Sequence, residues 1–154
     1  MVLRTAIAVF LLDILTKTAS LHILHPFTPV KIIPGFFSLS LVFNRGAAFG
    51  ILPGAAAIFM ILALATIVSI FVFAWRSKAA PLVRKIALGL ICGGAVGNLL
   101  DRIRFGHVVD FLDFYLRGWH WPAFNVADSS LCIGAGLLLW KALFQRPPST
   151  AHPS

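Results

Sequence analysis

Four long apolar stretches dominate the pattern of hydrophobic and polar positions along the chain. They cover about residues 5–24, 55–75, 82–100 and 126–144. A helix needs about 20 predominantly apolar residues to cross a membrane, and each stretch has about that length. The pattern therefore predicts an integral membrane protein of mainly α class, with four transmembrane helices in a single domain over residues 1–146. Residues 147–154, rich in proline and serine, are expected to form a disordered tail.

The two longer connections between these helices, residues 25–54 and 101–125, carry patterns of their own. In the first, a turn signal at Pro34-Gly35 precedes residues 37–43, where phenylalanine and leucine alternate with serine. A period of two is typical of a half-buried strand, so we expect a small β-sheet that forms a cradle at the membrane surface. The second connection is rich in aromatic residues, which favour the headgroup level of a bilayer, and it predicts an interfacial loop or helix.

Composition agrees with a membrane protein, and the distribution of charge predicts its orientation. The chain is 59% hydrophobic and 12% charged, with a mean hydropathy of +0.92, whereas soluble domains are about 25% charged. The net charge of +8 comes from basic residues scattered among the apolar stretches, so no basic stripe for nucleic acid is indicated. The basic connection 76–85 and the basic chain ends predict cytoplasmic termini. The sheet and the aromatic connection are then extracytoplasmic.

All five acidic residues are aspartates, and two of them cluster with asparagine and arginine at the ends of the predicted helices. If these residues are placed on the four predicted spans and their connections, several polar groups fall near the outer boundary of the membrane: residues 44–46, 98–102, 110 and 125–128. Residues three or four apart share one face of a helix, which places Asn125 beside Asp128. By the same spacing, Asp13 and Lys17 form a pair inside the first span.

Each of these groups also has a structural interpretation, which the pattern leaves open. Asn125 or Asp128 is suited to cap the fourth helix. Asp101 and Arg102 are suited to form an ion pair at the interface. For the pair inside the first span, mutual neutralisation within the helix is the favoured interpretation.

Asp110 and Asp128 are the leading candidates for chemistry. Two neighbouring carboxylates in a low dielectric repel each other, so one stays protonated while the other is ionised. Such a pair is suited to hydrolysis, because one member activates water and the other protonates the leaving amine. The sequence contains no H-E-x-x-H and no G-x-S-x-G motif. Cys92 and Cys132 lack the spacing of a disulfide framework or a zinc site, so neither is indicated.

Two other classes of protein use similar residues. A transporter places its polar groups near the bilayer midplane, whereas here nearly all of them lie at one boundary. A structural scaffold needs only close helix packing, and Gly89, Gly93 and Gly97 recur every four residues on the third span, as in helices that approach closely. Hydrolysis at the membrane surface fits the polar pattern better than either.

Five blocks of the sequence carry a resemblance to a known family. They read D-I-L-T-K at residues 13–17, N-R-G-A-A-F-G at 44–50, G-A-V-G-N-L-L-D-R at 94–102, V-V-D-F at 108–111 and F-N-V-A-D at 124–128. In this order, with four spans between them, the chain resembles signal peptidase II, the lipoprotein signal peptidase. The resemblance implies an aspartic endopeptidase of the bacterial inner membrane. Such an enzyme removes the signal peptide from prolipoproteins by cutting before a cysteine that carries diacylglycerol, without metal or cofactor.

The resemblance also implies roles for individual residues. Asp110 and Asp128 match the family's catalytic dyad, and Asp101 supports it. Further polar residues match positions that bind substrate or support the dyad: Asn44, Asn98, Arg102, Asn125 and Asp13. The implied partners are prolipoproteins with a lipid-modified cysteine and membrane lipids, with no nucleic acid, and we expect a monomer. The protein is expected to cross the inner membrane several times, with its active site near the extracytoplasmic surface.

Overall fold

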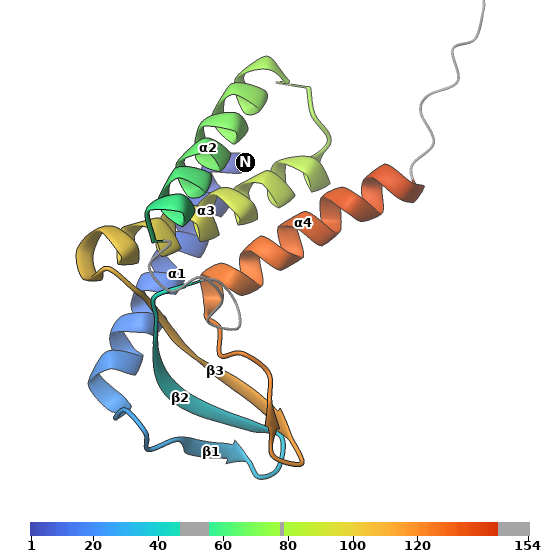
Figure 1. Cartoon of the computed structure of the whole chain (residues 1–154). Coiled ribbons are helices and arrows are strands. Elements are labelled where there is room, and N and C mark those ends of the chain that lie inside the picture. The colour runs from blue at the N-terminus through green and yellow to red at the C-terminus, as the bar shows by residue number, and fades with distance from the viewer. Residues whose placement is uncertain (47–55, 78, 145–154) are drawn as a thin grey trace, which may run out of the picture.

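Four long helices make up most of the computed structural model, which describes residues 1–46, 56–77 and 79–144 (Figure 1). They are α1 (Val2–Ile23), α2 (Ala56–Arg76), α3 (Leu82–Phe105) and α4 (Val126–Phe144). Each is long and apolar enough to cross a membrane, which confirms the four predicted spans. Helix α3 continues to Phe105, so Asp101 and Arg102 lie in its last turns instead of in the connection that follows. The expected tail at 147–154 and part of the 44–50 block lie outside the described residues.

A small antiparallel sheet lies at the end of the bundle where α1 and α3 end and α4 begins (Figure 1). Its strands are β1 (Val30–Ile33), β2 (Phe37–Asn44), β3 (Val108–Leu116) and β4 (Trp119–His120), paired in the order β1-β2-β3-β4. The strand predicted at residues 37–43 is confirmed as β2. The aromatic connection, expected to form an interfacial loop or helix, instead supplies β3 and β4. Strand β3 pairs along β2 from Phe37 to Asn44, which satisfies backbone groups that an unpaired strand edge leaves free.

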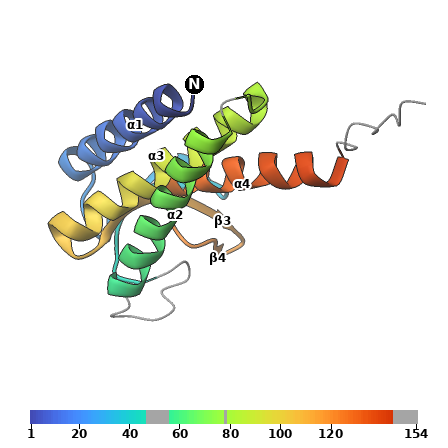
Figure 2. The same ribbon diagram turned by 90° about the horizontal axis from the view of Figure 1, so that it is seen from above.

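Helix α3 is the central helix of the bundle, in contact with each of the other three. Figure 2 shows α1 and α2 on different sides of it. Glycines make these approaches possible: a Cβ atom at Gly93 would lie 2.6 Å from the carbonyl oxygen of Ala6 and 2.7 Å from Cβ of Val9. On the side of α4, a Cβ at Gly94 would lie 2.5 Å from the carbonyl oxygen of Ala127. The expected role of the glycines in close helix packing is therefore confirmed.

The hydrophobic core joins the sheet to the end of α1, while most of the helical surface is left apolar and uncovered. Leu24, Leu41, Val109 and Phe111 form the buried cluster. In contrast, α2 buries Ile70, and most of its other large apolar side chains are exposed. A membrane supplies the missing cover for such a surface. The buried cluster fixes the sheet to the end of α1.

Replacing Gly93 by alanine is predicted to destabilise the bundle, because the added methyl group collides with the backbone of α1. We expect a loss of about 1–3 kcal/mol, measured as a lower unfolding temperature in detergent. Gly136→Ala is the matched control, since a Cβ there meets nothing within 4 Å. It should leave stability unchanged or slightly raised. Equal stabilities of the two variants would contradict the packing argument.

Candidate active site

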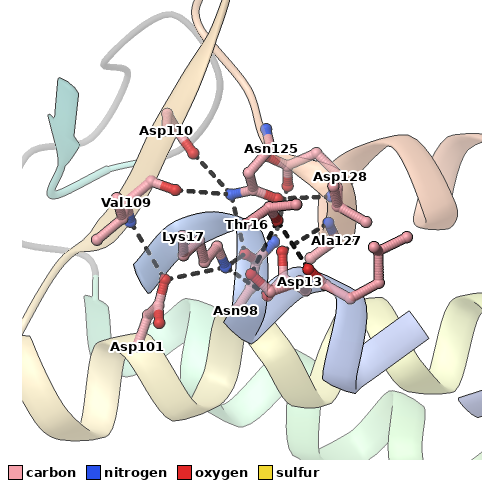
Figure 3. A network of polar contacts seen from close by, with 12 residues as sticks. Asp13, Thr16, Lys17, Asn98, Asp101, Val109, Asp110, Asn125, Ala127 and Asp128 are labelled. Atoms are coloured by element: carbon pink, nitrogen blue, oxygen red, sulfur yellow. Dashed lines mark hydrogen bonds and ion pairs between the residues drawn. The ribbon is translucent and has the colours of Figure 1, made fainter. Parts of the chain in front are cut away.

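The polar residues singled out in the sequence meet where α1, α3 and α4 reach strands β2 and β3 (Figure 3). Strand β3 supplies Asp110, the first turn of α4 supplies Asp128, and α3 supplies Asn98. Asn44 ends β2, and Asn125 immediately precedes α4. The structure thus brings five of the predicted site residues, distant in sequence, into one network.

Asn125 connects the two aspartates and is completely buried, at 0% exposure. Its Nδ2 donates to Oδ1 of Asp110 at 2.7 Å, and its Oδ1 accepts from the backbone N–H of Asp128 at 2.9 Å. Oδ2 of Asp128 in turn accepts from the backbone N–H of Asn125 at 3.3 Å, which completes the reciprocal pattern of a capping box. The capping interpretation is therefore confirmed, and the same asparagine also holds the first carboxylate.

Each oxygen of the two carboxylates accepts a hydrogen bond. Oδ2 of Asp110 accepts from Nδ2 of Asn44 at 2.9 Å. Oδ1 of Asp128 accepts from Nδ2 of Asn98 at 2.7 Å. Neutral amides thus orient both carboxylates without adding a positive charge beside them, so the repulsion between the two persists.

The environments of the two aspartates differ. Asp110 is 1% exposed, whereas Asp128 is half-buried and lines a cavity. Burial, and next the negative charge of Asp128, raise the pKa of Asp110 to about 7, against the opposing hydrogen bonds from Asn44 and Asn125. Asp110 therefore keeps a proton up to neutral pH, which is the property of the acid in an acid-base pair.

Lys17 is the centre of a buried ion cluster beside this pair. Its Nζ lies 2.7 Å from Oδ2 of Asp13 and 2.9 Å from Oδ2 of Asp101, and it donates to Oδ1 of Asn98 at 3.1 Å. The predicted neutralising pair inside the first span is confirmed and has a further partner on α3. The sequence marked Lys17 as a charge within a span, but its contact with Asp101, 84 positions away, leaves no local signal.

Arg102 does not pair with its neighbour Asp101, so the interfacial ion pair considered from the sequence is wrong. Its guanidinium donates to the backbone carbonyls of Asn98 at 3.2 Å and Gly46 at 3.4 Å. The same group lies over the ring of Phe59, 5.3 Å from its centre. Arg102 thus connects α3 to Gly46, just after β2, and to α2.

A cavity of about 470 Å³ opens beside Asp128. Asn44, Asn98 and Arg102 also line it, and the rest of its wall is mainly apolar. A cavity with a few polar groups and mainly apolar walls is typical of a binding site for a largely apolar ligand. The apolar and aromatic part of this wall includes Val108, Trp121, Pro122, Ala123, Phe124 and Leu131.

Asp113 belongs to a separate cluster on the sheet that the sequence analysis did not identify. Its Oδ2 accepts from the hydroxyls of Ser38 at 3.0 Å and Ser40 at 2.9 Å, and its Oδ1 lies 2.9 Å from Nδ1 of His120. Although burial acts to raise its pKa, the hydrogen bonds from His120, Ser40 and Ser38 hold the pKa of Asp113 below its ordinary value. The spacing of the two serines on one face of β2 was the available signal.

Within the residues that the structure describes, no three His, Cys, Asp or Glu side chains are grouped to hold a metal ion. Cys92 and Cys132 are free thiols.

Replacing Asp113 by asparagine is predicted to weaken the sheet, because neutral asparagine loses the charge-assisted hydrogen bonds. We expect a loss of about 1–3 kcal/mol in stability at neutral pH, measured by thermal unfolding in detergent. The folded-state pKa of Asp113 is lowered, so its contribution is present above the ordinary carboxylate range and is lost as the pH falls through the lowered pKa. The difference between parent and variant should shrink over that acidic range. A difference that is constant with pH would contradict this account.

Comparisons with known proteins agree with this architecture. A family model described as signal peptidase (SPase) II matches residues 5–144. The lipoprotein signal peptidase of Polynucleobacter necessarius is 43% identical over 145 residues, which cover 92% of this chain and 88% of that protein. That of Ralstonia nicotianae is 49% identical over 133 residues, which cover 84% of this chain and 76% of that protein.

Solved structures show the same fold. Two chains described as bacterial membrane enzymes superpose with TM-scores of 0.88 and 0.83, at 31% and 32% sequence identity. The first match covers 99% of this chain and 93% of the solved one, and the second covers 94% of both. This chain therefore belongs to the signal peptidase II family and is a membrane-embedded protease.

Proposed function

We propose that this protein is an aspartic endopeptidase that removes signal peptides from diacylglyceryl-modified prolipoproteins, cutting on the N-terminal side of the lipidated cysteine. The observation that carries the proposal is the pair Asp110 and Asp128, joined by the buried Asn125 beside a cavity with mainly apolar walls. The names of its relatives agree with this substrate class.

The different environments of the two carboxylates assign them different roles. Asp110, whose pKa is raised to about 7, is the acid. Asp128, which lines the cavity, is the base: it takes a proton from a water molecule as the water oxygen attacks the scissile carbonyl carbon. Asp110 transfers its proton to the carbonyl oxygen, which stabilises the tetrahedral intermediate.

The second half of the reaction restores both groups. Asp128 gives its new proton to the leaving amine as the C–N bond breaks, a step that the expectation from the sequence gave to the acid. The intermediate returns one hydroxyl proton to Asp110. The products are a carboxylic acid and a free amine at the lipidated cysteine, and one water molecule is consumed. The amides of Asn44 and Asn98 keep the carboxylates in place through the cycle.

The position of the site suits a substrate held by the membrane. A signal peptide lies in the bilayer as an apolar helix, and a lipidated cysteine stays at its surface. The scissile bond is then presented at the boundary where the bundle meets the sheet. The apolar part of the cavity wall accepts side chains of the signal peptide, and Arg102 and the amides that line the cavity can hold the peptide backbone.

The orientation follows from the basic residues at the opposite end of the bundle. Arg4 near the start of α1, Arg76 at the end of α2, and Arg84 and Lys85 near the start of α3 all lie away from the sheet. The positive-inside rule assigns that end to the cytoplasm. The site then faces the extracytoplasmic side of the bacterial inner membrane, with both ends of the chain in the cytoplasm. A monomer in contact with membrane lipids is sufficient for this arrangement.

Replacing either member of the pair by asparagine is predicted to abolish cleavage, because asparagine keeps the shape and cannot exchange the proton. We expect Asp110→Asn and Asp128→Asn to lower kcat by about a hundredfold to ten-thousandfold. Cleavage of a diacylglyceryl-modified prolipoprotein by the purified proteins is followed on a gel, beside the unlipidated form.

Asp113→Asn is the matched control, since Asp113 lies on the same strand as Asp110 but belongs to the separate cluster on the sheet. It should keep its activity at temperatures where it is folded. Full activity in a folded Asp110→Asn or Asp128→Asn protein would remove that residue from the mechanism. Equal cleavage of the unlipidated form would overturn the substrate assignment.

The dependence of cleavage on pH is predicted to be bell-shaped. The acid must hold its proton, and the pKa of Asp110 is raised to about 7, so activity should fall as the pH rises through about 7. At low pH the base becomes protonated and activity falls again, and the two limbs belong to the coupled pair. The measurement is kcat/KM between pH 4 and pH 9, which spans about the range of both limbs. A rate that keeps rising above pH 8 would contradict the assigned acid.

A further inference from the structure

We propose that Lys17 is a positioning residue for both catalytic aspartates, acting through Asn98, Asp13 and Asp101. The inference rests on the proposed function, since it assigns a role within the same reaction. Lys17 lies on α1 and contacts neither carboxylate of the pair through any hydrogen bond that the structure records. Its effect therefore passes through the groups that it holds.

The contact of Lys17 with Asn98 fixes the orientation of the Asn98 side-chain amide. Oδ1 of Asn98 accepts from Nζ of Lys17 at 3.1 Å and from Nδ2 of Asn125 at 3.2 Å. An ammonium group is a donor only, so a reversed amide would place its NH₂ group against the cation. Lys17 thereby directs Nδ2 of Asn98 to Oδ1 of Asp128, the contact measured at 2.7 Å.

A second series of polar contacts runs from Lys17 through Asp13 to the start of α4. Oδ2 of Asp13 pairs with Lys17 at 2.7 Å, while Oδ1 accepts from the backbone N–H of Ala127 at 2.9 Å. Ala127 immediately precedes Asp128. The ion pair on α1 therefore holds the backbone from which the proposed base projects.

A third series of polar contacts runs from Lys17 through Asp101 to strand β3. Oδ2 of Asp101 lies 2.9 Å from Nζ of Lys17 and accepts from the backbone N–H of Val109 at 3.2 Å. Val109 immediately precedes Asp110, the proposed acid. One buried ammonium group thus organises the residues directly before both aspartates, which come from different elements (Figure 3).

Lys17 is also the positive charge inside this ring of carboxylates. Its charge interacts with Asp13 on its own helix, Asp101 on α3, Asp110 on β3 and Asp128 on α4. Arg102 on α3 is a second positive charge that acts on the last three of these carboxylates. The charge of Lys17 opposes the rise in the pKa of Asp110. Removing the charge should therefore move the titration of the pair upward, which a residue that only fills space does not do.

Lys17→Met tests the inference, because methionine fills a similar volume without charge or donor. We expect kcat on the lipidated substrate to fall about tenfold to a hundredfold, with KM within about twofold of the parent. The pH profile should move upward by about one pH unit. Ser20→Ala is the matched control: Ser20 is also buried on α1, but its hydroxyl bonds back to the Thr16 carbonyl of the same helix, and kcat should not change.

A double variant separates the connection through Asn98 from general damage. If Lys17 acts partly through Asn98, then Lys17→Met combined with Asn98→Ala should lose less than the product of the two single losses. Losses that multiply fully, together with an unshifted pH profile, would overturn the inference and leave Lys17 a structural residue.

Two further results keep the inference separate from the proposed function. If Lys17→Met does not fold, Asp101→Asn replaces it, since it removes one ion pair and keeps an acceptor for Val109. It should lower kcat about threefold or more with little change in KM, and parental kcat would overturn the inference. If the parent cleaves the substrate, and folded Lys17→Met keeps full kcat and an unshifted pH profile, the inference about Lys17 is overturned and the proposed function stands. A folded parent without cleavage overturns both.

Discussion

Burial of charge at the end of an apolar bundle is the constraint on which the rest of this structure depends. An ionised side chain is costly in a low-dielectric setting unless it is paired and hydrogen-bonded. Lys17 and Asp13 meet that requirement almost without exposure, at 3% and 0%, and Asp101 completes the ion cluster. Since the partners of these groups come from α1, α3, α4 and β3, satisfying the charges also brings these four elements together at one place.

Close helix packing is what makes that pairing possible. A Cβ atom at Gly97 would collide with the carboxylate of Asp13, so the glycine leaves the space that the charged group occupies. Gly93, one turn earlier, allows the backbone of α1 to approach. The glycine series and the ion cluster are thus parts of one arrangement. Small residues bring the helices near, and the polar residues at the end of the contact fix their register.

Much of this arrangement could be predicted from the sequence, because it depends on local patterns. Apolar length predicted the four spans, a period of two predicted β2, and helical spacing placed Asn125 with Asp128. The partners of Asp101 and Asp113 could not be predicted, since Lys17 lies 84 positions from the first and Ser38 lies 75 positions from the second. The aromatic connection forms β3 by pairing with β2, and this pairing is equally non-local.

The segment at residues 124–128 shows why structure and chemistry are hard to separate at such a site. The backbone of Phe124 pairs with Leu112 on β3 in both directions. Asn125 caps α4 and holds Asp110, and Ala127, at 0% exposure, packs against Gly94 and donates to Asp13. Any change of volume here alters sheet, helix and carboxylates together. A loss of activity at Asn125 or Ala127 would therefore say little about mechanism. An isosteric change at Asp110 instead removes the exchangeable proton at constant volume, with the loss of one of the two hydrogen bonds that the carboxylate accepts.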